Sequence, residues 1–300
     1  MKKRILAMVL ALTMAGTMMA GCGSSGDDAA AENDNAAAEE TTAEETEETA
    51  EAENADASTE EASEEPVELY VFIAASLSNA MEELKTAYQE EHPNVDIKYN
   101  VDSSGTLQTQ IEEGAQCDIF FSAALQQMDA LVEGGYVDQG NVANLLENKV
   151  VLIKPTGGET TVTGFSDITN AANLALAGED VPVGQYARKI FDNLGITDQV
   201  MAMEINEGAN VTAVLTAVAE HSNEVGIVYS TDAASMPDDV EVIAEATEEE
   251  VGEAVVYPVG LVKDEQATEA QTEAAKDFYE YLQSDDAAAV FEEYGFAVNQ

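Results

Sequence analysis

From residue 67 onward, short apolar segments alternate with segments whose apolar residues recur at helical spacing. Residues 67–75 are rich in β-branched and aromatic side chains, which is typical of a buried strand. The apolar residues between Leu77 and Tyr88 then fall on one face of a helix. Similar patterns predict strands at 95–101 and 118–121, a helix after Ser103-Ser104-Gly105 and another helix around 128–132. This order predicts a parallel sheet covered by helices on both faces.

A second set of strands and helices begins with a strand at 150–154, which Pro155 ends. Asn210 is a good N-cap for the helix that follows it. The remaining pattern predicts strands at 174–177, 225–229, 240–244 and 254–262, and helices at 181–194, 211–218, 266–283 and 287–294. We therefore expect two α/β lobes, each a mostly parallel sheet flanked by helices, joined by two hinge strands at 150–154 and 255–262. Lobe 1 is predicted over 67–150 and 258–300, and lobe 2 over 151–257.

The first 21 residues have the pattern of an export signal. Lys2-Lys3-Arg4 precedes an apolar or weakly polar run over 5–20, which is too short for a stable transmembrane helix. Met19-Ala20-Gly21-Cys22 resembles the lipobox of bacterial lipoproteins, in which the cysteine is acylated and becomes the mature N-terminus. We predict a lipoprotein signal peptide at 1–21 and lipidation of Cys22; the alternative is a cysteine that falls after a signal peptide by chance.

Residues 22–66 are predicted to form an acidic, disordered tether. From Gly23 to Glu65 no aromatic or large aliphatic residue occurs, and residues 27–65 hold 17 acidic groups and no base. Nothing there can offset a backbone entropy cost of roughly 1–2 kcal/mol per residue. Self-repulsion favours an extended spacer, with a dedicated binding role as the alternative.

Composition limits the partners of the protein. The formal net charge of −49 argues against nucleic acid and against an anionic membrane surface as partners, because both need clustered Lys and Arg. Apolar residues make up 45% of the chain, which is enough for a buried core. With two cysteines, two histidines and no tryptophan, neither a disulfide scaffold nor a Cys/His zinc site is expected.

Small hydroxyl-bearing or backbone-exposing residues occupy four joins between strand and helix. These joins are at 74–76, 103–105, 181–184 and 208–211, and Tyr229 closes a fifth strand. Ligands of open α/β sheets bind beyond the carboxyl ends of strands, and helix N-termini there offer unpaired N–H groups. Several such joins in one cleft would bind an anion without Lys or Arg. Taken singly, each serine is also a plausible N-cap, and Tyr229 a plausible core residue.

Together, these segments resemble the molybdate-binding proteins of bacterial molybdate ABC transporters over essentially all of 67–298. The matching motifs, in chain order, are VFIAASLSNA at 71–80, SSGTL at 103–107 with QIEEGA at 110–115, DIFFSA at 118–123, VPVGQYA at 181–187, GIVY at 226–229, YPV at 257–259 and FEEYGF at 291–296. Seven motifs in register make the resemblance specific. Val183 stands where that family has Ala, and Gln127 where it commonly has an aromatic residue.

The resemblance implies a two-lobed, periplasmic-binding-protein-like fold of type II that closes on a tetrahedral oxyanion. It implies that Ser76 and Ser104 supply hydroxyl and amide donors, Val183 and Val211 backbone N–H groups, and Tyr229 its phenol. The ligand is then molybdate or tungstate, held through its oxygens without direct metal ligands and without a cofactor. The implied partners are an ABC permease and its ATPase. The protein is expected to be a monomer on the outer face of the cell membrane, held there by its lipid anchor alone.

The same fold also serves functions other than molybdate transport. Another oxyanion such as sulfate, or a ligand-sensing lipoprotein without a transport role, fits the same fold, and Asp102 could serve as an acceptor for protonated phosphate. An enzyme is not expected, because no G-x-S-x-G motif occurs and His92 and His221 are placed at helix ends. Cys117 is expected to be buried apolar filler, although a nucleophile is the alternative.

Overall fold

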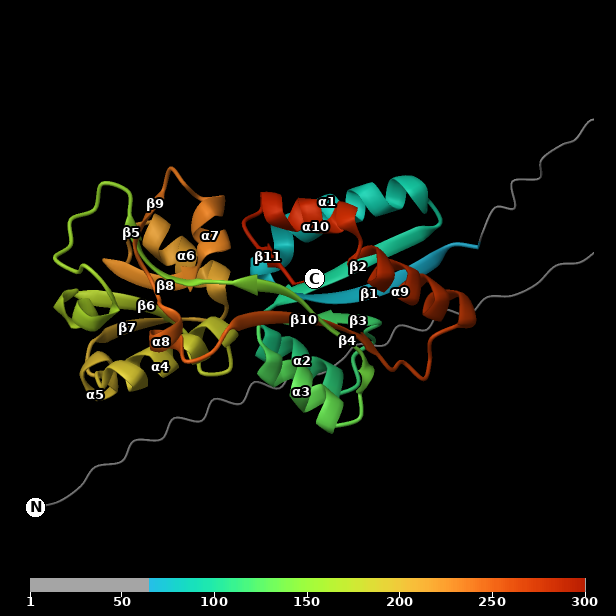
Figure 1. The fold of residues 1–300 in the computed structure, drawn as a ribbon, viewed down its shortest axis with the longest axis horizontal. Coiled ribbons are helices and arrows are strands. Elements are labelled where there is room, and N and C mark those ends of the chain that lie inside the picture. The colour runs from blue at the N-terminus through green and yellow to red at the C-terminus, as the bar shows by residue number, and fades with distance from the viewer. Residues whose placement is uncertain (1–64, 300) are drawn as a thin grey trace, which may run out of the picture. The chain divides into compact units, whose positions relative to one another are not determined.

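The computed structural model describes residues 65–299, which lie within one compact unit, Glu60–Gln300. These residues form two β-sheets, each accompanied by helices (Figure 1). The predicted signal peptide, Cys22 and the tether before residue 65 lie outside the described residues. Within the described part, no helix is both long and apolar enough to cross a membrane.

The first sheet contains six strands in the spatial order β11-β4-β10-β3-β1-β2. Its strands are β1 (Val67–Ala74), β2 (Val95–Asp102), β3 (Ile119–Phe121), β4 (Val137–Asn148), β10 (Val255–Val262) and β11 (Ala297–Val298). Its helices are α1 (Ser78–Glu91), α2 (Ser104–Glu112), α3 (Leu125–Glu133), α9 (Glu269–Tyr281) and α10 (Asp285–Glu293), with a 3-10 turn at Ala75–Leu77 before α1.

The two faces of this sheet are covered by different helices, because neighbouring strand residues point to opposite faces. Val71 and Ile73 pack in one core cluster with apolar residues of α1 and α10. Phe72, between them, packs in the other cluster with residues of α2 and α3. Figure 1 shows α1 and α10 on one side of the sheet and α2 and α3 on the other. The predicted cover on both faces is therefore present.

The second sheet contains five strands in the order β7-β6-β8-β5-β9. Its strands are β5 (Val150–Pro155), β6 (Asn173–Ala177), β7 (Glu204–Gly208), β8 (Val225–Tyr229) and β9 (Val240–Glu245). The helices in this part of the chain are α4 (Pro182–Leu194), α5 (Thr197–Val200), α6 (Val211–Ala219), α7 (Ser230–Ser235) and α8 (Glu248–Val251), with a 3-10 segment at Phe165–Asn170.

Both sheets are mixed, so the α/β architecture is confirmed but the expected mostly parallel order holds for only part of each sheet. β1 pairs in parallel with β2 and β3, and β6 with β7 and β8. The strands nearest the passages between the sheets run antiparallel: β10 to β3 and β4, and β5 to β8 and β9. Parallel neighbours need a crossover connection such as a helix, whereas antiparallel neighbours do not. Strands at which the chain enters or re-enters a sheet, such as β5 and β10, can therefore pair in the antiparallel direction.

The chain passes between the sheets twice. The first passage is at Lys149, between β4 and β5, and the second includes α8, between β9 and β10. β5 thus belongs wholly to the second sheet and β10 to the first, so neither of the two strands predicted to join the lobes is itself shared between them.

Candidate functional site

The five residues expected to bind an anion line one cavity between the two sheets. Ser76 and Ser104 follow the carboxyl ends of β1 and β2, and Tyr229 ends β8. Val183 and Val211 lie in the first turns of α4 and α6. The cavity is small: about 200 Å³ of space there is not filled by atoms, and this figure includes space open to solvent. Chain segments up to 153 residues apart therefore meet at one small space, at the strand ends where ligands of α/β sheets bind.

No charged residue lines this cavity. Its walls consist of Ala74, Ala75, Ser76, Ser103, Ser104, Ala123, Val181, Pro182, Val183, Val211 and Tyr229. Three helices of nine residues or more, α2, α4 and α6, begin at its wall. The N–H groups of a first helical turn have no acceptor within the helix and carry a partial positive charge. The cavity can therefore stabilise negative charge with neutral groups alone.

The two serines at the start of α2 have different roles. Ser103 is the N-cap, and its side chain accepts a hydrogen bond from the Thr106 N–H over 3.1 Å. Ser104 is fully buried, and its Oγ accepts from the Ala123 N–H over 2.9 Å. That bond occupies a lone pair of Ser104 and leaves its proton free to be donated. The capping interpretation thus applies to Ser103, while Ser104 faces the cavity.

The Tyr229 hydroxyl is a buried donor without a protein partner. Its side chain is 1% exposed, and its oxygen makes no hydrogen bond of good geometry in the described structure, although the Tyr257 hydroxyl lies nearby. Burial, and then the neighbouring phenol of Tyr257, raise the pKa of Tyr229 well above its usual value, so the group stays protonated. A buried polar group left unsatisfied typically costs about 1–3 kcal/mol. A bound anion would supply the missing acceptor.

Ser76 is connected to residues that the sequence did not identify. Its Oγ lies 3.0 Å from the hydroxyl of Tyr257, which in turn accepts from Asn148 over 3.1 Å. Tyr257 belongs to the YPV motif at 257–259, but no role could be assigned to it from the sequence. Asn148 gives no recognisable signal, because its position beside Tyr257 depends on the pairing of β4 with β10.

Direct contacts join the two sides around the cavity. Gln127 of α3 donates to the side chain of Gln185 of α4 over 3.2 Å. Asn210 donates to Asp102 over 3.4 Å, and Asp102 also accepts from the Ser103 N–H over 2.7 Å. The Asp102 carboxylate is absent from the cavity wall, which leaves the suggested phosphate acceptor outside the site. The structure therefore has the two sides in contact around the site.

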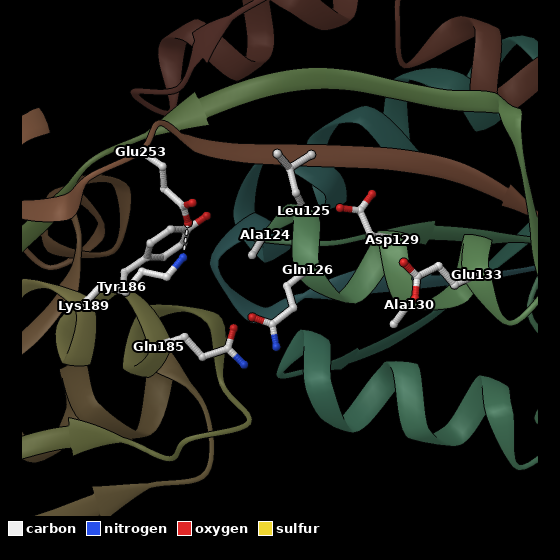
Figure 2. A pocket seen from close by; sticks show the side chains of 10 residues that line it. All are labelled: Ala124, Leu125, Gln126, Asp129, Ala130, Glu133, Gln185, Tyr186, Lys189 and Glu253. Atoms are coloured by element: carbon white, nitrogen blue, oxygen red, sulfur yellow. Dashed lines mark hydrogen bonds and ion pairs between the residues drawn. The ribbon is translucent and has the colours of Figure 1, made fainter.

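A wider hollow lies next to these contacts. Figure 2 shows residues of α3, such as Gln126 and Asp129, on one side and Gln185 and Lys189 of α4 on the other. Lys189 forms an ion pair with Glu253 at this hollow. Its space of about 960 Å³, which includes open solvent, and its charged lining distinguish it from the small cavity.

The residues considered for catalysis lie away from the cavity. Cys117 is 1% exposed, and burial raises its pKa well above the usual value, so its thiol stays protonated. His92 stacks on Tyr88 and lies 3.6 Å from an Asp277 carboxylate oxygen. Neither histidine lines the cavity. Among residues 65–299, no group of three or more His, Cys, Asp or Glu side chains is arranged to hold a metal ion.

Known proteins share this fold and sequence. YvgL of Bacillus subtilis, provisionally named as an ABC transporter substrate-binding lipoprotein, is 40% identical over 235 residues, covering 78% of this chain and 88% of YvgL. The molybdate-binding protein ModA of Escherichia coli is 33% identical over 238 residues, covering 77% of this chain and 89% of ModA.

Solved structures agree with the sequence comparisons. The substrate-binding domain of a provisionally assigned molybdenum ABC transporter from Clostridium difficile superposes with a TM-score of 0.59 at 32% identity, covering 78% of this chain and all of that one. The periplasmic molybdate-binding protein of Azotobacter vinelandii, at 20% identity and a TM-score of 0.65, shares the two-lobed fold. Residues 69–297 match the family described as bacterial extracellular solute-binding protein, and the chain therefore belongs to that family.

Proposed function

We propose that this protein is a receptor that captures molybdate or tungstate outside the cytoplasm and delivers it to an ABC permease driven by its ATPase. Support comes from relatives named as molybdate-binding proteins and from a cavity whose polar groups suit an oxyanion. We further propose that Cys22 anchors the protein to the outer face of the membrane as a monomer. YvgL, named as a lipoprotein, supports the anchor.

The chemistry of the cavity favours a fully deprotonated anion. Molybdate, tungstate and sulfate carry no proton near neutral pH, so they only accept hydrogen bonds. Ser76, Ser104 and Tyr229 can donate hydroxyl protons, and the first turns of α4 and α6 offer N–H groups. Phosphate keeps a proton that needs an acceptor, and no carboxylate lines the cavity. The proposed role is binding without catalysis.

Binding and closure are coupled in this proposal. Ser76 and Ser104 come from the side of the first sheet, whereas Val183, Val211 and Tyr229 come from the second. An anion that accepts from both sides stabilises the closed form over the open one by its extra bonds. We propose that the part of the chain around the first sheet and the part around the second are the lobes that move, with the passages at Lys149 and before β10 as hinges. These hinges would shift the lobe borders predicted at 150 and 258 to about Lys149 and Val255.

The observation that carries the proposal is the unpartnered Tyr229 hydroxyl in a cavity without charged residues. Calorimetric titration of the protein with molybdate, tungstate, sulfate and phosphate tests it directly. We expect molybdate and tungstate to bind below the millimolar range and phosphate not to bind. If none of the four anions binds, the proposal is wrong; preferential binding of sulfate would reassign the ligand.

Two substitutions test the site itself. Ser76→Ala and Ser104→Ala each remove a hydroxyl donor, and each is expected to weaken binding by about 1–3 kcal/mol. Ser284→Ala is the matched control, because Ser284 caps α10 by accepting from the Ala287 N–H over 3.2 Å and is outside the cavity. It is expected to lower stability without changing affinity. Wild-type affinity in both cavity variants would refute the assignment.

A further inference from the structure

Three hydrogen-bonded side chains connect the passage between the sheets to the cavity. Asn148, the last residue of β4, donates from Nδ2 to the Tyr257 hydroxyl over 3.1 Å. That hydroxyl lies 3.0 Å from Ser76 Oγ, and Ser76 lines the cavity. Asn148 is 8% exposed and Tyr257 is fully buried, so the bonds form away from bulk water.

One backbone amide determines the direction of the first bond. The Lys149 N–H donates over 2.8 Å to the side chain of Asn148, and an N–H group can only donate. The atom it meets is therefore the oxygen Oδ1, which also accepts from the Ser230 hydroxyl over 2.9 Å. The other atom is then Nδ2, which can only donate. Asn148 must donate to Tyr257, and Tyr257 must accept.

The second bond follows from the first. Burial raises the pKa of Tyr257 well above its usual value, so the hydroxyl keeps its proton and needs an acceptor for it. Apart from Asn148, Ser76 is the partner that meets this hydroxyl with good hydrogen-bond geometry in the described structure, while the nearby Tyr229 phenol does not. Tyr257 then donates to Ser76 Oγ. The hydroxyl proton of Ser76 is then not used in these hydrogen bonds and is available for donation to a group in the cavity.

We infer that Asn148 and Tyr257 are positioning residues that fix the Ser76 hydroxyl with its proton toward the bound anion. The inference rests on the proposed function. In the reverse orientation Ser76 would present a lone pair, which an anion cannot use. Asn148 also donates to Thr231 Oγ1 over 2.9 Å, two residues after Tyr229. The same amide therefore also bonds to the start of α7, in the part of the chain around the second sheet.

The variant Tyr257→Phe removes the hydroxyl and keeps the ring, which makes edge contacts with Tyr229 and Phe296. We expect it to weaken molybdate binding about two- to tenfold, the usual contribution of one neutral hydrogen bond. In a Ser76→Ala background, the same substitution is expected to change affinity less than twofold. A role confined to packing would instead lower affinity by the same factor in both backgrounds.

Asn148→Asp provides a second variant of nearly the same shape. The carboxylate accepts instead of donating, so the Tyr257 proton turns toward it and Ser76 donates to Tyr257. We expect a loss greater than that of Tyr257→Phe. The loss should shrink in the Ser76→Ala background, whereas simple repulsion between the new charge and the anion would persist there. Tyr99→Phe is the matched control, since Tyr99 donates to the Met81 carbonyl over 2.8 Å and is absent from the cavity wall.

The outcomes separate this inference from the function on which it rests. No binding by the wild-type protein overturns both. Normal wild-type binding with equal losses in the two backgrounds, or with no loss in either variant, overturns the inference alone. Thermal unfolding of each variant without ligand identifies any that does not fold; if Tyr257→Phe is such a case, Asn148→Asp in both backgrounds decides the question.

Discussion

Gly105 offers a direct test of whether the two sides of the cavity meet when the ligand is bound. It is the second residue of α2 and faces the backbone of Asp180, in the loop between β6 and α4. A Cβ atom at position 105 would lie 2.1 Å from the Asp180 carbonyl oxygen and 3.0 Å from its carbonyl carbon. A backbone carbonyl cannot rotate away as the end of a flexible side chain can, so Gly105→Ala forces the two sides apart.

The size of the effect follows from this overlap. The oxygen must retreat by roughly 1 Å to reach the 3.0 Å below which Cβ contacts essentially do not occur. Overpacking of this kind typically costs about 1–3 kcal/mol, which corresponds to about 5- to 150-fold in affinity if only the closed form suffers. In an open form, alanine in place of glycine within a helix is favourable by up to about 1 kcal/mol. Affinity and stability should therefore change in opposite directions.

Calorimetric titration with molybdate and thermal unfolding of the free protein measure the two quantities. We expect Gly105→Ala to bind 5- to 150-fold more weakly while the unfolding midpoint of the free protein stays equal or rises. Gly140→Ala is the control, because a Cβ atom there meets nothing within 4 Å, and its affinity should not change. Unchanged affinity in Gly105→Ala would show that α2 and the loop at Asp180 do not meet in the bound form.

Three further predictions concern single residues of the site and its surroundings. Tyr229→Phe removes the unpartnered hydroxyl, so it should weaken molybdate binding by about 1–3 kcal/mol in calorimetry without lowering the stability of the free protein. Val183→Ala should lower the free energy of unfolding by about 1–2 kcal/mol in urea titrations but change affinity less than twofold, since the donor is the amide; a large loss of affinity would contradict this assignment. Burial raises the pKa of Asp232 to about 7, against about 3.9 in an unfolded chain, so its contribution to stability is full below about pH 4 and is lost as the pH rises through 7. The side chain of Asp232→Asn does not titrate, so the urea midpoint of this variant should rise relative to that of the wild-type protein between pH 4 and pH 7. If the two midpoints change equally with pH, the pKa of Asp232 is not raised.

The local pattern of the sequence predicted those elements whose burial is periodic. The helix capped by Asn210 is confirmed, because the Asn210 side chain accepts from the Ala213 N–H over 3.0 Å. The strands β4 and β7 were not predicted, because most of their residues are not buried and neither strand has a continuous apolar run. Local sequence patterns also do not indicate whether a strand pairs in the parallel or the antiparallel direction, because this depends on where the chain re-enters the sheet.

The residues of the cavity could likewise be predicted only in part from the sequence. The hydroxyl-bearing residues at strand ends were recognisable from the sequence, and the structure brings them together. The positions of Asn148 and Tyr257 could not be predicted, because their hydrogen bonds join β4, β10 and the turn after β1. Likewise, no sequence pattern marks Gly105 as a contact, since its neighbour Asp180 is 75 residues away along the chain.

The use of backbone N–H groups as donors has a consequence for how such a protein evolves. In the proposed site, Val183 and Val211 would donate through their backbone N–H groups, which every residue type except proline has. Side chains at these positions can change under selection for packing alone while the ligand preference is inherited unchanged. We therefore expect relatives with the same ligand preference to diverge at these two positions, as Val183 differs from the alanine expected from the resemblance.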